Sequence, residues 1–117
     1  VLEEHRDIVW SLALTKNDEL ISGSSHGEMK VWDLHSGICL KDLKEHKKDI
    51  ISLAIGINNE LYSCCWGYLI KIWDMKNFKV LKTFKPHEDL IESMVVGKNG
   101  EIITGSTDKT IKIWKVL

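Results

Sequence analysis

The sequence predicts an all-β protein built from three consecutive four-stranded antiparallel sheets, because a 41-residue period runs through it without a gap. Two columns of identical residues mark this period: His5, His46 and His87, and, 27 residues after each of them, Trp32, Trp73 and Trp114. Within each period, short apolar runs alternate with turn residues, and no helical periodicity interrupts them. A period of this length is typical of small units that bury their faces only against their neighbours, so we expect the copies to stack.

The second copy, residues 46–86, shows the expected strands most clearly. The four runs that we expect to form strands are residues 49–55, 61–65, 69–73 and 79–84. The first run is nearly continuous in apolar residues, which suits a strand buried on both faces, whereas the last alternates like a half-exposed outer strand. Asn58-Asn59, Gly67-Tyr68 and Lys76-Asn77 separate the runs with residues that tight turns favour.

Composition excludes several classes of function. The chain carries 16 Lys and Arg against 17 Asp and Glu, so there is no basic excess to drive binding to nucleic acid. No apolar run approaches the length of a transmembrane helix, and we expect no membrane contact. The three cysteines show no CxxC spacing, which favours a reduced, intracellular protein of the cytoplasm or nucleus. We expect Cys64 and Cys65 to pack in the core on opposite faces of one strand.

Three motifs in register resemble the WD-repeat β-propeller family. They are Ser22-Gly23-Ser24 leading to Trp32-Asp33, His46 opening a repeat that Trp73-Asp74 closes, and Thr104-Gly105-Ser106-Thr107-Asp108 leading to Trp114. The resemblance implies blades at 5–45, 46–86 and 87–117, the last one incomplete, with each first strand at a central channel. It makes residues 1–117 one propeller segment. Because propellers have about four to eight blades, we expect a piece of a longer propeller. The alternative is a six-blade ring closed by two copies, a homo-oligomer that requires the chain to be complete as printed.

The resemblance also implies a hydrogen-bonded tetrad in each blade, made of His, Ser or Thr, Trp and an Asp in the turn between the second and third strands. The expected members are His5, Ser22 and Trp32; His46, Ser63 and Trp73; and His87, Thr104, Asp108 and Trp114. His26 and Gly67 stand where the first two copies need the Asp, so we expect these blades to lack a carboxylate anchor. The repeated Lys30, Lys71 and Lys112 are expected to be solvated ammonium groups on packed stems.

The same resemblance points to three positions per blade on the top face of the propeller. These top-face residues are Ile8, Trp10 and Ser25; Asp49, Ile51 and Trp66; and Leu90, Glu92 and Thr107. Trp10 and Trp66 are not repeated in the other copies, so the fold alone does not explain them. Either they pack between blades, or they form an apolar patch that anchors a protein or peptide.

The sequence predicts binding rather than catalysis. No nucleophile elbow, phosphate loop or HExxH motif is present, and we expect no catalytic residue, cofactor or metal. Equivalent histidines of successive blades lie too far apart to share one zinc ion. His26 near His5 is a minor candidate for a pH-sensitive contact. The predicted function is a protein–protein interaction scaffold, with two alternatives: a self-assembling structural protein, or a reader of nucleic acid or modified histones.

Overall fold

Each of the three copies forms one antiparallel sheet in the computed structural model, which describes residues 1–3, 5–44 and 46–115. The first sheet comprises β1 (Val9–Leu14), β2 (Glu19–Ser24), β3 (Met29–Asp33) and β4 (Cys39–Leu43), with a short 3-10 turn, η1 (Ser25–Gly27), before β3. The second comprises β5 (Ile50–Ile55), β6 (Leu61–Cys65), β7 (Ile70–Asp74) and β8 (Lys79–Phe84). The third comprises β9 (Ile91–Val96), β10 (Ile102–Ser106) and β11 (Ile111–Trp114). The all-β prediction is confirmed.

The strands of each sheet follow chain order because tight turns connect them. Between the first two strands of the three copies, the turn residues Asp18, Asn59 and Gly100 adopt positive φ angles of 58°, 64° and 84°. Asn, Asp and Gly tolerate this conformation better than other residues do. The local turn chemistry therefore produces the same hairpin three times.

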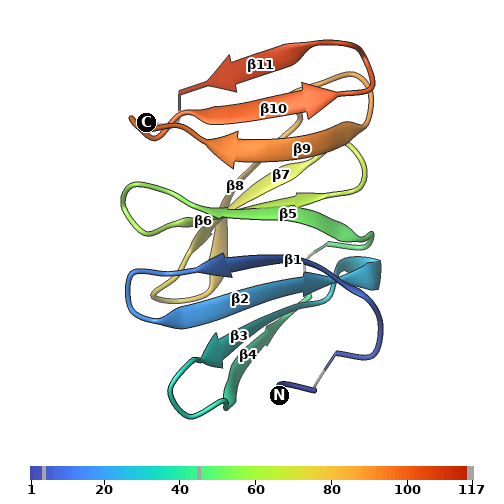
Figure 1. Cartoon of the computed structure of the whole chain (residues 1–117). Coiled ribbons are helices and arrows are strands. Elements are labelled where there is room, and N and C mark those ends of the chain that lie inside the picture. The colour runs from blue at the N-terminus through green and yellow to red at the C-terminus, as the bar shows by residue number, and fades with distance from the viewer. Residues whose placement is uncertain (4, 45, 116–117) are drawn as a thin grey trace.

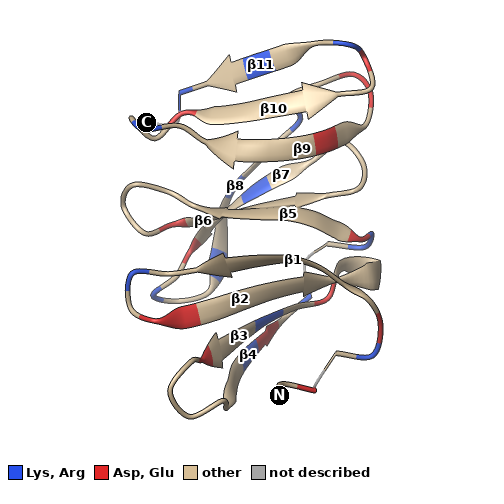
Figure 2. Ribbon diagram, in the orientation of Figure 1, with Lys and Arg blue, Asp and Glu red and all other residues tan. Residues whose placement is uncertain are grey.

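The three sheets stack face to face in an arc, in which β1 contacts β5 and β5 contacts β9 (Figure 1). One core, between the first two sheets, consists of Ile21, Met29, Val31, Leu43, Ile50, Leu53, Leu61, Cys65 and Trp73. A second core, between the last two sheets, consists of Tyr62, Cys64, Ile70, Ile72, Ile91, Met94 and Ile102. Figure 2 shows charged residues mainly in the turns and on the third and fourth strands of the sheets, whereas β1 and β5 carry none and β9 carries Glu92.

Cys64 and Cys65 lie on opposite faces of β6, one in each core. Burial raises the pKa of Cys64 to about 12 and also raises that of Cys65. Both are therefore neutral thiols that pack as small apolar groups, as expected from the sequence.

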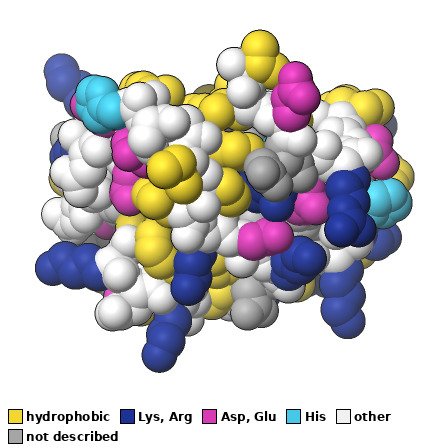
Figure 3. Space-filling view, turned by 90° about the horizontal axis from the view of Figure 1, so that it is seen from below, with side chains coloured by type: hydrophobic (Ala, Val, Ile, Leu, Met, Phe, Trp, Pro, Cys, Tyr) yellow, Lys and Arg dark blue, Asp and Glu magenta, His cyan; other side chains and the backbone are white. Residues whose placement is uncertain are grey.

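The two outermost sheet faces of the arc leave apolar side chains exposed. On the first sheet, Leu12 and Leu14 are 60% and 53% exposed, and on the third, Ile111 and Ile113 are 76% and 67% exposed. Figure 3, a view from below onto the first sheet, shows hydrophobic side chains among lysines and acids. Equivalent positions of the second sheet are covered on both sides, so only the end blades present such faces.

Candidate functional site

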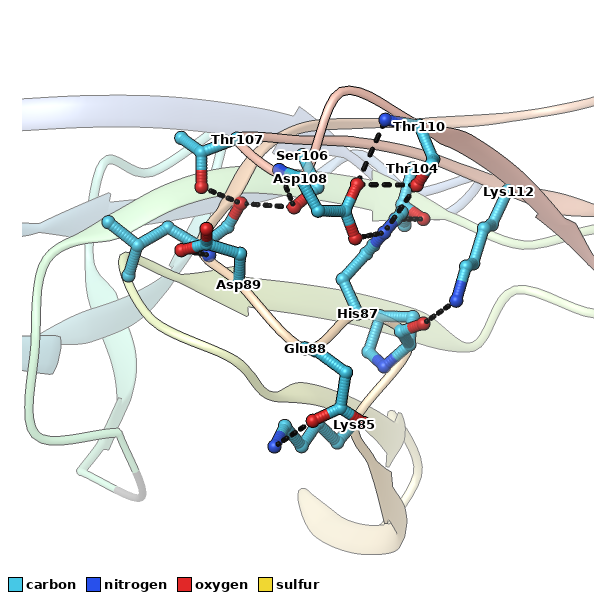
Figure 4. A network of polar contacts seen from close by, with 12 residues as sticks. Lys85, His87, Glu88, Asp89, Thr104, Ser106, Thr107, Asp108, Thr110 and Lys112 are labelled. Carbon is cyan, nitrogen blue, oxygen red and sulfur yellow. Dashed lines mark hydrogen bonds and ion pairs between the residues drawn. The ribbon is translucent and has the colours of Figure 1, made fainter.

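The third blade contains a hydrogen-bond network around His87, in the segment just before β9 (Figure 4). His87 Nδ1 lies 2.8 Å from Asp108 Oδ2, and His87 Nε2 lies 2.7 Å from Thr104 Oγ1. Hydrogen bonds from Thr110 and His87 lower the pKa of Asp108 to about 2, so this carboxylate is ionised at neutral pH. The expected tryptophan bond is missing: Trp114 Nε1 is buried with no partner among the described residues, and its ring packs against Phe84.

The first blade has a carboxylate anchor that the sequence analysis missed. His5 Nδ1 lies 2.6 Å from Glu28 Oε1, while His5 Nε2 contacts the Ser22 hydroxyl. Trp32 Nε1 donates to the same hydroxyl at 2.9 Å. The expectation that this blade lacks an anchor is wrong, because Glu28 reaches the histidine from the position that Thr110 holds in the third blade. Glu28 lies two residues after His26, which occupies the position of Asp108, and its side chain, which is longer than that of Asp, brings the carboxylate to the histidine ring.

The second blade is the one whose histidine has no carboxylate partner among the described residues. His46 Nε2 lies 2.6 Å from Ser63 Oγ, and Trp73 Nε1 donates to the same oxygen at 2.8 Å. Gly67 stands at the Asp108 position, and Leu69 stands at the Glu28 position. Burial, and then the charge of Lys71, lower the pKa of His46 to about 4. His46 is therefore neutral in the folded protein at neutral pH.

This neutral histidine predicts an acid-sensitive fold. In the unfolded chain His46 takes up a proton near pH 6.5, but in the folded chain only near pH 4. Its contribution to stability is therefore complete above pH 6.5 and falls as the pH drops to 4, by about 3 kcal/mol in total. Urea unfolding of the wild type and of His46→Gln between about pH 6.5 and about pH 4 measures this loss of stability. We expect the variant to lose less stability on acidification, and parallel pH profiles would contradict this expectation.

Among the repeated lysines, Lys30 differs from the expected solvated group. Lys30 is buried, and its Nζ lies 3.1 Å from Asp42 Oδ2. Burial opposes the charge of Lys30, but the Asp42 carboxylate outweighs this effect, so the pKa of Lys30 lies above its ordinary value. Lys71 Nζ donates to the Thr83 hydroxyl and Lys112 Nζ to a backbone carbonyl, so neither of them has a carboxylate acceptor among the described residues.

His26 does not join His5 in the structure. Its ring lies on the surface with Nε2 3.7 Å from Asp7 Oδ2, and its backbone N–H donates to Asp49 Oδ1 at 3.1 Å. The described contacts of His26 are thus with acidic residues, and one of them crosses from the first blade to the second. Within the described ranges, no three His, Cys, Asp or Glu side chains are close enough together to hold a metal ion.

One backbone hydrogen bond recurs among the top-face residues in all three blades. Ser25 N–H donates to the carbonyl of Ile8, Trp66 N–H to that of Asp49, and Thr107 N–H to that of Leu90, at 3.2, 2.7 and 3.0 Å. The bond joins the turn after the second strand to the segment before the first. It places these pairs at the same end of each sheet, where η1 and the beginning of β1 lie at the right of Figure 1.

The top-face residues differ in how much they are available to a partner. Ile8, Trp10 and Trp66 are 57%, 50% and 46% exposed, and Glu92 and Thr107 are also exposed. Trp10 Nε1 donates to Ser25 Oγ at 3.0 Å, which holds the indole at the surface. The four half-buried members are Ser25, Asp49, Ile51 and Leu90, and of these Ile51 packs against the second core.

A groove of about 400 Å³ lies beside Trp66 on the second blade. Its lining residues are His46, Lys47, Lys48, Cys65, Trp66, Gly67, Tyr68, Leu69 and Lys71. Lys48 Nζ lies 5.9 Å from the centre of the Trp66 ring, and Lys85 Nζ lies 5.3 Å from that of Tyr68. Sequence reasoning found Trp66 but not this groove, because the lining comes from three separate segments that only the fold brings together.

The sequence model of the WD domain, G-beta repeat family (WD40) matches three segments of the chain, residues 1–33, 37–74 and 78–115. The chain belongs to the WD40 family. The first match covers β1 to β3, the second covers β4 to β7, and the third covers β8 to β11. Each match ends one residue after a repeated tryptophan, Trp32, Trp73 or Trp114. No curated protein sequence matched this WD40 chain.

Solved WD40 propellers share the arrangement of the three blades. The WD40 β-propeller domain of Doa1 superposes with a TM-score of 0.84 at 28% identity, covering 95% of this chain and 38% of that one. U3-55K gives a TM-score of 0.86 at 24% identity, with coverages of 99% and 38%. The Cps50 (Swd1) propeller of Myceliophteria thermophila gives 0.80 at 19% identity, with coverages of 93% and 34%. This WD40 chain therefore spans little more than a third of each structure.

The described part of this WD40 chain contains no helix with the length and apolar character needed to cross a bilayer.

Proposed function

We propose that this WD40 segment is a non-catalytic protein–protein interaction scaffold that binds a protein or peptide on its top face. The observation that carries the proposal is the exposure of two tryptophans at one end of the sheets, Trp10 at 50% and Trp66 at 46%. Neither is part of the repeat, and neither is needed to fill a core between blades. Exposed tryptophans that lie beside polar groups are typical anchors of protein interfaces.

Backbone geometry supports the same proposal. The recurring hydrogen bond described above fixes the turn that carries Ser25, Trp66 or Thr107, so the top face is a set of side chains on rigid hairpins. A surface that is already ordered loses little conformational entropy when a partner binds.

Free cysteines, two of them adjacent and buried, favour an intracellular setting for this role.

Truncation of Trp66 tests the proposal. We expect Trp66→Ala to weaken partner binding by about 2 kcal/mol, or roughly thirtyfold, because the indole would be an interface anchor. Quantitative capture from cell extract, followed by affinity measurement on each captured protein, checks this. Leu81→Ala is the matched control, because Leu81 is 65% exposed on the outer strand β8, far in the fold from the top face. Equal binding of the partner by the wild type, Trp66→Ala and Leu81→Ala would contradict the assignment of Trp66 to the partner-binding top face.

A second candidate role, self-assembly, is favoured by the exposed faces of the end blades. Leu12 and Leu14 on one end and Ile111 and Ile113 on the other match the positions that are covered in the second blade. Further blades of a longer propeller, which we favour, or a second copy of the chain would cover them. The mass of the native gene product distinguishes the two. A product much heavier than 13.4 kDa supports the longer propeller, and one near that mass supports closure by copies of the chain.

A further inference from the structure

The groove of the second blade lies where the other two blades have a carboxylate. In the first blade Glu28 is 2.6 Å from the histidine ring, and in the third Asp108 is 2.8 Å from it. In the second blade Gly67 and Leu69 hold the equivalent positions, and the space beside them is part of the groove of about 400 Å³. His46, which is only 6% exposed, lines this groove and has no acidic partner among the described residues.

One neutral tautomer of His46 suits an anionic acceptor. Trp73 Nε1 donates to Ser63 Oγ, which leaves the serine hydroxyl hydrogen free to be donated to His46 Nε2. A neutral imidazole that accepts at Nε2 carries its proton at Nδ1. In the other two blades the corresponding Nδ1 atom faces a carboxylate oxygen. In this tautomer the second blade presents the same donor without the same acceptor in the described part of the chain.

Positive charge is concentrated around this groove. Lys47, Lys48 and Lys71 line it, whereas Lys85, which lies over the ring of Tyr68 at its edge, is paired with Glu88 Oε2 at 3.3 Å. The two residues after the histidine are Arg6 and Asp7 in the first blade and Glu88 and Asp89 in the third, so only the second blade is purely basic there. Lys71 bonds the Thr83 hydroxyl, whereas the equivalent Lys30 has Asp42 as its partner. The groove therefore has cations in excess of the carboxylates in the described structure.

The shape and surroundings favour a peptide over a nucleic acid strand. The acidic residues of the neighbouring blades, Asp7 and Glu28 on one side and Glu88, Asp89 and Asp108 on the other, would repel a continuous phosphate backbone. Trp66, Tyr68 and Leu69 are 46%, 45% and 38% exposed and supply apolar contact beside the lysines. One acidic side chain next to apolar ones fits this combination of charge and surface.

We propose that the second-blade groove binds an acidic side chain of a peptide partner, whose carboxylate takes the place that Glu28 and Asp108 hold in the neighbouring blades. This inference rests on the proposed function, since the groove includes the top-face residue Trp66. It adds the chemistry of the partner: a Glu or Asp flanked by apolar residues. The carboxylate accepts from His46 Nδ1 and is surrounded by Lys47, Lys48 and Lys71.

A pair of peptides tests the proposal on the whole chain. Acetyl-Leu-Glu-Leu-amide and acetyl-Leu-Gln-Leu-amide are titrated while NMR follows the imidazole of His46 and the indole of Trp66. We expect the Glu peptide to bind at least about tenfold more tightly, with the difference shrinking between about 0.02 M and about 0.2 M salt. The bound carboxylate should also raise the pKa of His46 from its low value, because it favours the protonated ring. The other titratable groups facing the groove are Lys47, Lys48, Cys65, Tyr68 and Lys71.

Matched variants separate this groove from general charge effects. The double variant Lys47→Gln, Lys48→Gln should weaken binding of the Glu peptide at least about fivefold. Lys82→Gln, Lys98→Gln removes the same charge from exposed positions outside the groove and should leave binding unchanged. Equal binding of the two peptides, or equal weakening by the two double variants, would overturn the proposal. Tighter binding of oligo-dT than of the Glu peptide, lost in Lys47→Gln, Lys48→Gln, would replace it with a nucleic acid site.

Two further results separate the inference from the proposed function. If the Glu peptide fails to shift His46 while Trp66→Ala still loses its captured partners, the top-face role stands and the acidic-peptide inference fails. Glu45 adjoins His46 in the sequence and lies outside the described residues, so Glu45→Gln is included. We expect it to leave the His46 pKa of the free chain nearly unchanged. A clear fall would show that the chain's own carboxylate fills the site, which would also overturn the inference.

Discussion

Replacing Trp73 with alanine is expected to destabilise the fold by about 3–5 kcal/mol, enough to unfold the second blade. Trp73 is 1% exposed within the core between the first two blades, and its Nε1 donates to Ser63 Oγ at 2.8 Å. Truncation would leave a cavity between the blades and remove one partner from the His46–Ser63 pair. Urea unfolding followed by circular dichroism measures the loss.

Trp66→Ala is the matched control for Trp73→Ala. Both changes remove an indole from the same blade, but Trp66 is 46% exposed and contributes to neither core. We therefore expect Trp66→Ala to cost less than about 1 kcal/mol. If the two variants lose similar stability, Trp66 is a packing residue, and its assignment to the partner-binding surface is wrong.

Gly27→Ala is expected to destabilise the contact between the first two blades by about 3 kcal/mol or more, from backbone strain and overpacking together. Gly27 has a φ of +81°, and a β-carbon there would lie 1.9 Å from the carbonyl oxygen of His46. That carbonyl belongs to the backbone that leads into the second blade, so relief requires the blades to move apart. Thermal unfolding of the variant measures the effect.

Gly37→Ala is the control that separates the strain of a positive φ angle from the clash between a β-carbon and the His46 carbonyl oxygen. Gly37 has a similar φ of +72°, but a β-carbon there would meet only the Leu2 side chain, at 3.4 Å. The control should therefore lose about 1 kcal/mol, the cost of a positive φ alone. Equal losses in the two variants would mean that the close approach of Gly27 to His46 contributes nothing to the fold.

Most of the fold could be predicted from the sequence because its determinants are local. Four strands per copy follow from short apolar runs and turn residues that are neighbours in the chain, and the structure places β5 to β8 within one residue of the expected ranges. The period itself indicates that the copies are equivalent, so evidence from the second copy applies to the others. The WD40 match and the solved propellers confirm this part of the prediction.

The details of the histidine networks could not be predicted, because they depend on side-chain reach in three dimensions. Alignment by position finds Asp108 but not Glu28, which reaches the equivalent nitrogen from a residue two places later. Alignment also assigns Trp114 the same bond as Trp32 and Trp73, yet its Nε1 is buried without a partner in the described structure. The groove on the second blade exists where Gly67 and Leu69 replace the carboxylate side chain of the other blades. A repeat consensus records the residues that recur and does not show the space left by such a replacement.

The two faces of every sheet are chemically different, and this gives the stack a direction. One face carries the repeated lysine and tryptophan, and the other carries mainly aliphatic side chains, with Tyr62 and Cys64 among them in the second sheet, so each interface joins unlike surfaces. Such a heterologous interface can be extended only head to tail, and a twofold axis cannot relate the two sides. A further repeat unit would therefore present its aliphatic face to Leu12 and Leu14, or its lysine-tryptophan face to Ile111 and Ile113.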